Sequence, residues 1–208
     1  MKRHLLFLLL LVSISVSAQV EHGVLVGGGV GFSMQDNKQL DWDASDLKYN
    51  HKLKINGMIG YRFRFLPERT FFYDLDVTVG FQKMNSHKYS PFFAADGNNG
   101  YSQNGDDKSF SEFIMPVSVA ASWNIRFSKN CYFGLGVAPT LYARPQAVFD
   151  LPVLAKLGCR AGRHCELSLS YQYGCLNTLK HFNNGPAYGR TGRLSDFMFS
   201  VYIPFTIK

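Results

Sequence analysis

The stretch YRFRFLPERTFFYDLDVTVGF, residues 61–81, alternates apolar and polar side chains on both sides of a short turn. Alternation with a period of two is typical of a β-strand whose two faces meet different surroundings. Before the turn, aromatic residues alternate with Arg62 and Arg64, and after it apolar residues alternate with Asp74 and Asp76. The stretch therefore predicts a β-hairpin with one apolar face and one charged face.

The same alternation recurs along the rest of the chain. It marks segments at about 22–33, 52–65, 70–84, 112–127, 131–144, 149–160, 164–176 and 194–207. Short turns at 66–69, 128–130 and 161–163 alternate with loops at 34–51, 85–111, 145–148 and 177–193, most of them longer and polar. This arrangement predicts eight antiparallel strands in up-and-down order.

The apolar face carries more large rings than the inside of an eight-stranded barrel can hold, because that space is only wide enough for side chains to fill. Its aromatic residues include Phe63, Phe65, Phe71, Tyr73, Phe81, Trp123, Phe127, Tyr171, Tyr173, Phe197 and Phe199. The other face consists of small residues and a few charges, and a lysine or arginine facing lipid at the midplane costs about 2–4 kcal/mol. We therefore predict an all-β fold, an eight-stranded antiparallel up-and-down transmembrane β-barrel, with its apolar face toward lipid.

Seven charged residues fall on the predicted interior face. They are Arg62, Arg64, Asp74, Asp76, Arg126, Lys156 and Glu166. Buried charges are tolerated only when they are paired, and the two signs here are able to neutralise each other. The set predicts a structural charge network that plugs the barrel, and no catalytic, cofactor or metal site is predicted.

The stretch VLVGGGVGFS, residues 24–33, resembles a phosphate-binding loop only in its glycine content. It matches neither of the glycine-rich phosphate motifs, and no helix is predicted after it. Gly27, Gly29 and Gly31 alternate on the interior face of the first strand. We expect them to leave room for large side chains from other strands.

The N-terminus has the pattern of a secretory signal peptide over residues 1–18. Lys2 and Arg3 precede an apolar run that is shorter than the roughly 20 residues of a spanning helix. Residues 19–208 are then one outer-membrane β-barrel domain of a Gram-negative bacterium. Without Lys2 and Arg3 the net charge is +5 (22 − 2 = 20 basic against 15 acidic residues), with no basic run, so no nucleic-acid partner is predicted.

The four cysteines indicate a disulfide, because the chain is predicted to be exported. Cys159 and Cys165 are equidistant from Gly162 and share one face, so the hairpin brings them opposite each other, and this pair is the predicted bridge. Cys131 begins the adjacent strand at the same rim and competes for Cys159. Cys175 is expected to stay free.

Two other functions fit parts of the sequence. A membrane-embedded enzyme that modifies lipid or lipopolysaccharide would use loop residues such as His51, His87 and His181, and Ser86, His87 and Asp96 make a Ser/His/acid set. Nearly any polar loop offers such a set, so we predict that the protein is not an enzyme. A soluble periplasmic ligand-binding barrel is the other alternative.

Four stretches carry a resemblance to a known family: FIMPVSVAASWNIRF (113–127), CYFGLGVAPTLYA (131–143), LSLSYQYGCLNTL (167–179) and FMFSVYIPF (197–205). They resemble the PorT-type outer-membrane β-barrel domain of Bacteroidota. The resemblance implies a small barrel, and one branch of that family is linked to a protein-secretion apparatus. No cofactor is predicted. The expected partners are outer-membrane lipid, the barrel-assembly machinery and a surface or secretion-apparatus protein.

Overall fold

The computed structural model describes residues 20–36, 48–89, 93–96, 100–103, 108–162, 164–181 and 191–205, and the predicted signal peptide lies outside them. Its strands are β1 (Val20–Asp36), β2 (Lys48–Phe65), β3 (Phe71–Tyr89), β4 (Phe93–Asp96), β5 (Gly100–Gln103), β6 (Lys108–Arg126), β7 (Cys131–Val137), β8 (Thr140–Arg144), β9 (Val148–Asp150), β10 (Val153–Arg160), β11 (Glu166–Tyr173) and β12 (Thr191–Pro204). One short 3-10 helix, η1 (Leu179–His181), precedes β12. No helix in the described residues is long and apolar enough to cross a membrane.

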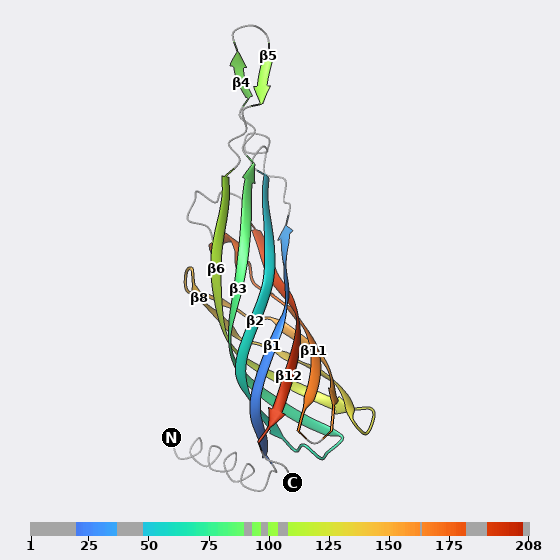
Figure 1. The fold of residues 1–208 in the computed structure, drawn as a ribbon. Helices are drawn as coiled ribbons and strands as arrows, with labels where there is room; N and C mark the ends of the chain where they lie inside the picture. The colour runs from blue at the N-terminus through green and yellow to red at the C-terminus, as the bar shows by residue number, and fades with distance from the viewer. Residues whose placement is uncertain are drawn as a thin grey trace, which may run out of the picture.

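Ten of these strands form one antiparallel sheet that closes into a ring (Figure 1). The first and last strands are paired, with Gly23 of β1 opposite Pro204 of β12, and β3 also pairs with β6. The remaining two strands, β4 and β5, form a separate hairpin. The prediction of an all-β antiparallel fold is confirmed.

Two strands of the ring are interrupted at prolines. The dipeptide 138–139 separates β7 from β8, and the dipeptide 151–152 separates β9 from β10; each ends in proline, which has no N–H to donate to the ladder. The Ala138 N–H donates to the Pro152 carbonyl at 2.8 Å. The Val119 N–H donates to the Pro139 carbonyl at 3.0 Å. Each interrupted pair therefore continues as one strand of the ring, and the ring has the eight strands that the alternation predicts.

The large apolar side chains lie on the outside of the ring. Ile55 is 75% exposed, Phe127 is 64% exposed and Ile59 is 62% exposed. The polar side chains that alternate with them are buried inside, as the sequence predicts for the two faces. This distribution is the reverse of the one found in a water-soluble domain, where the apolar face is covered.

One residue of the predicted outer face points inward instead. The β2–β3 register shifts between Leu53 and Asn56, so one extra residue is inserted in β2. Because side chains alternate with a period of two, a one-residue insertion moves the following side chains to the other face. Leu53 accordingly packs against buried interior side chains instead of facing outward.

The interior is filled in two layers. Near the short turns it holds the charged side chains of β2, β3, β10 and β11. Near the longer loops it holds an apolar cluster, which we call the apolar layer: Met84, Ile114, Tyr142, Val148, Leu179 and Leu194.

Three strands extend past the rest of the ring on the loop side. Pairing between β1 and β2 stops at Ile55, and β6 pairs with β8 only over residues 115–118. Residues 48–54 of β2 and 108–114 of β6 therefore pair with β3 on one side and have no ladder partner on the other side among the described strands. We call this three-stranded extension the blade, and the β4–β5 hairpin lies farther out along the same direction (Figure 1).

Candidate functional site in the filled interior

Two arginine–aspartate pairs form the base of the charged layer. The strand register places Arg62 opposite Asp76 and Arg64 opposite Asp74. Arg62 donates from Nε and Nη2 to the two carboxylate oxygens of Asp76 at 2.7 and 2.8 Å. Arg64 donates in the same way to Asp74, at 2.7 and 3.0 Å. Bidentate pairs of this kind are among the strongest charged hydrogen bonds. Both pairs form between the two neighbouring strands of the 61–81 hairpin.

Glu166 reaches both arginines from the opposite wall of the ring. Its Oε1 accepts from Arg62 Nη1 at 2.9 Å and from Arg64 Nη2 at 2.8 Å. A further contact joins its Oε2 to Arg64 Nη1. The Tyr132 hydroxyl donates to the same carboxylate at 2.6 Å. Glu166 thus braces β11 against β2 across the interior.

Lys156 completes the charge balance from β10. Its Nζ donates to Asp74 Oδ2 at 2.7 Å and lies 3.8 Å from Asp76 Oδ2. Three cationic and three anionic groups now occupy one layer, and each of these residues is at most 6% exposed. We call this set, Arg62, Arg64, Asp74, Asp76, Lys156 and Glu166, the ionic layer. Its charges sum to zero, which is the condition under which buried ions are tolerated.

Aromatic rings stack on the two guanidinium groups. The Arg64 guanidinium carbon lies 4.6 Å from the Phe72 ring centre and 5.1 Å from that of Tyr132. Tyr202 lies 5.1 Å from the Arg62 guanidinium carbon. Cation–π contacts of this kind strengthen when water is excluded. Phe72 is not among the residues predicted from the sequence, although it is in phase with Asp74 and on the same face of β3.

Arg126 does not join the ionic layer, contrary to the prediction. It is the last residue of β6, and its Nη2 donates to the Pro67 carbonyl at 2.6 Å. A separate ion pair at the same rim joins Arg160 Nη2 to Glu21 Oε1, 2.5 Å apart. At the end of its strand, Arg126 is near enough to the turn to satisfy a backbone carbonyl there. Six of the seven predicted charges are therefore together, and the seventh lies at the rim.

The disulfide also differs from the prediction. Cys131 of β7 and Cys159 of β10 are opposite each other and are bonded, with their Cα atoms 4.1 Å apart. The predicted partner, Cys165, is a free, half-buried thiol. The β10–β11 register pairs Cys159 with Leu167, so the midpoint of the turn is one residue after Gly162. That displacement moves Cys165 out of position, and the neighbouring strand supplies the bridge.

The described structure covers only part of the residues that an enzyme would use. The β2–β3 register places His51 opposite Ser86, and His87 follows Ser86 on β3. Asp96 ends β4, and the side chains of all four residues lie outside the described part. His181 ends η1 and is exposed. Among the described residues, no group of three or more His, Cys, Asp or Glu side chains could hold a metal ion.

No protein-family model and no curated protein matches the chain. Several solved structures are similar to it, including those of two bacterial proteins. One is Ail, the attachment invasion locus protein of Yersinia pestis, in complex with the heparin analogue sucrose octasulfate: 15% identity over 90% of this chain and 99% of that one, with a TM-score of 0.43. The other is the outer membrane protein OprG from Pseudomonas aeruginosa: 10% identity over 89% of this chain and 91% of that one, with a TM-score of 0.44. Neither similarity is high enough to transfer a role to this chain.

Proposed function

We propose that the chain is a small transmembrane β-barrel of the outer membrane of a Gram-negative bacterium, with a closed interior and a non-enzymatic role in structure or surface interaction. The observation that carries the proposal is the inversion of its two faces. Large apolar side chains surround the outside, while the six charges of the ionic layer are buried inside. In hydrocarbon every backbone group needs a partner, and a closed ring of strands is the β-structure that provides one.

Aromatic residues at the short-turn end support a membrane boundary there. Tyr61 and Phe63 have ring centres 5.0 Å apart, and Tyr61 and Phe205 have theirs 6.2 Å apart. His22 also contacts Tyr61. Rings of this kind concentrate where the bilayer meets water. Because outer-membrane barrels have short periplasmic turns and longer outer loops, we place this end in the periplasm and the blade outside the cell.

The closed interior argues for a role other than conduction. The ionic layer joins β2, β3, β10 and β11 by direct hydrogen bonds, and the apolar layer fills the loop side. An eight-stranded ring is only wide enough for side chains. We expect the purified protein to produce no single-channel conductance in planar bilayers.

The blade is the part best placed to meet a surface or secretion-apparatus partner. Its outer strands have one unpaired edge each among the described strands, and such edges are sites where another chain can add a strand. The resemblance to PorT-type domains adds a link with protein secretion to the proposal. Outer-membrane lipid and the barrel-assembly machinery are the partners that insertion itself requires.

Membrane fractionation of the full chain tests the proposal. We expect the protein in the outer-membrane fraction, extractable only with detergent, and running faster on gels before heating than after. Depleting the barrel-assembly machinery should lower its level there. A mature protein recovered in the soluble periplasmic fraction would contradict the membrane assignment and favour the soluble binding barrel. An altered lipid A profile in a deletion strain would favour an enzyme.

A further inference from the structure

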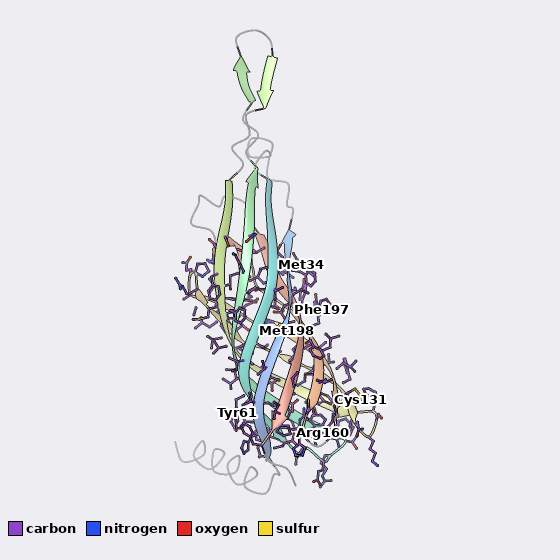
Figure 2. The ribbon with its side chains drawn as sticks, in the orientation of Figure 1. Met34, Tyr61, Cys131, Arg160, Phe197 and Met198 are labelled. Carbon is purple, nitrogen blue, oxygen red and sulfur yellow. A yellow bond between two sulfur atoms is a disulfide. The ribbon has the colours of Figure 1, made fainter. Side chains whose placement is uncertain are left out.

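A cavity of about 50 Å³ lies between the two interior layers. Thr78 lines it and is two residues along β3 from Asp76 of the ionic layer. Leu194 lines it and belongs to the apolar layer. Met198, another lining residue, is at mid-height of the ring (Figure 2). The cavity therefore lies in the middle of the ring, and nothing in the proposed function assigns a use to it.

The cavity is lined by polar atoms that have no partner. Asn56 is 6% exposed and Gln82 is 4% exposed. Asn56 Oδ1, Gln82 Nε2 and Asp196 Oδ1 make no hydrogen bond within the described part of the chain. All three residues line the same cavity. Because buried polar atoms nearly always have a hydrogen-bond partner, a polar occupant of the cavity is required to satisfy them.

The charge of Asp196 decides what kind of occupant fits. The ionic layer below is already neutral, and Lys156 donates to Asp74. The register places Asp196 opposite Gly31 and Gln172, which carry no charge, and no described ion pair includes it. Arg193, three residues before it, donates to the Tyr173 hydroxyl at 2.9 Å. A carboxylate inside a protein is unfavourable unless it takes up a proton or a positive charge is close to it, so at a pH that keeps Asp196 ionised the cavity requires a cation.

The size and the donor atoms narrow the choice to a small monovalent cation. A cavity of this volume has room for an ion and roughly two waters. It offers one carboxylate, the carbonyl oxygen of Asn56 and the hydroxyls of Ser118 and Thr140, which are hard oxygen ligands. A single negative charge is balanced by a single positive one. We propose that this cavity binds an alkali-metal cation, with Asp196 as its charge partner and Asn56 as an oxygen ligand.

Gln82 is able to serve this site in two ways. Its amide oxygen and nitrogen exchange places by a half-turn of the amide group. It therefore supplies a donor to a water bound to the ion, or a further oxygen ligand. The ligands come from β2, β3, β6, β8 and β12, so a bound cation ties distant strands of the ring together. The site thus predicts that a cation stabilises the folded ring.

Thermal unfolding of the full chain, refolded in detergent micelles, tests the proposal. The midpoint of unfolding, followed by tryptophan fluorescence in a non-ionic detergent, is measured at one alkaline pH and constant ionic strength in lithium, sodium, potassium or tetramethylammonium chloride. We expect one alkali cation, at ten times its dissociation constant, to raise the midpoint by about 3–6 °C over tetramethylammonium, which is too large to enter. Equal midpoints in the four salts would overturn the proposal.

Two variants locate the effect. Asp196→Asn keeps the side-chain shape and removes its charge, so the salt difference is expected to disappear. Asp76→Asn removes a carboxylate from the ionic layer instead, so it should lower the midpoint in every salt and keep the difference between them. A salt difference that persists in Asp196→Asn would place the cation elsewhere and overturn the assignment. If that variant does not fold, Asn56→Leu provides the test, and its half-maximal rise should move to higher salt.

Discussion

The two halves of the interior are held together in different ways. In the short-turn half, four strands are joined by ion pairs that cross the ring, and each charge of the ionic layer has a partner. In the loop half, apolar side chains fill the space, two strands are interrupted at prolines, and Asp196 has no cationic partner among the described residues. The comparison indicates that side-chain contacts across the interior stabilise the ring more strongly in the short-turn half than in the loop half. The loop half tolerates irregular structure next to the blade.

The largest expected effect comes from breaking the brace in the short-turn half. Glu166→Gln leaves Arg62 and Arg64 with one fewer buried counter-charge, and removing one partner of a buried ion pair typically costs about 3–5 kcal/mol. Urea titration of the protein folded in lipid vesicles measures the free energy of unfolding. Glu21→Gln is the comparison at the rim: Glu21 is 8% exposed, but its closest partner Arg160 is 30% exposed at the side chain and Arg64 is 3.8 Å away. Its cost should be smaller, about 1–2 kcal/mol.

Equal losses for the two variants would mean that the ionic layer is no stronger than the rim pair. The two halves of the interior would then not differ as the contacts indicate. If Glu166→Asp keeps the free energy of unfolding that Glu166→Gln loses, the negative charge, and not the length of the side chain, stabilises the ring.

The next largest effect is expected from lysine substitutions on the outer face, which test where the bilayer lies relative to the two halves. Ile59 is opposite Val26 and Val79 on the outer face, at the height of the cavity, whereas Phe63 is opposite His22 near the short turns. A lysine facing lipid costs about 2–4 kcal/mol at the midplane and about 0–1 kcal/mol near the interface. Ile59→Lys should therefore be the more destabilising of the two in vesicles. Equal costs for Ile59→Lys and Phe63→Lys would contradict this placement of the bilayer.

The same comparison shows what the sequence was able to predict. Alternation within one hairpin identifies both faces, and it places Arg62, Arg64, Asp74 and Asp76 on one interior face without knowledge of any distant strand. The disulfide of Cys159 depends on the register between two neighbouring hairpins, which a displacement of one residue changes. A bulge has the same effect at Leu53. Predictions thus succeeded where a face alone decides the outcome, and they failed where register does.

The cavity is a feature that depends on strand register. Asn56, Gln82 and Asp196 each alternate onto the interior face, so their orientation follows from the sequence. Their meeting at one height depends on the stagger of strands that are far apart along the chain. No spacing in the sequence signals it, because the ligands are single residues on separate strands.

The smallest expected effect of the three concerns the apolar layer. Leu179 is 1% exposed, and its side chain lies against Gly192 at the start of β12. Leu179→Ala leaves a cavity, for which losses of about 2–5 kcal/mol are usual. We expect about 2 kcal/mol, because η1 has only one turn and is free to settle into the space. Leu176→Ala, at a position that is 45% exposed, is the control and should change the free energy of unfolding by less than about 0.5 kcal/mol. A loss in Leu179→Ala as large as that in Glu166→Gln would show that the loop half closes the ring as firmly as the ionic layer, and the distinction between the halves would fail.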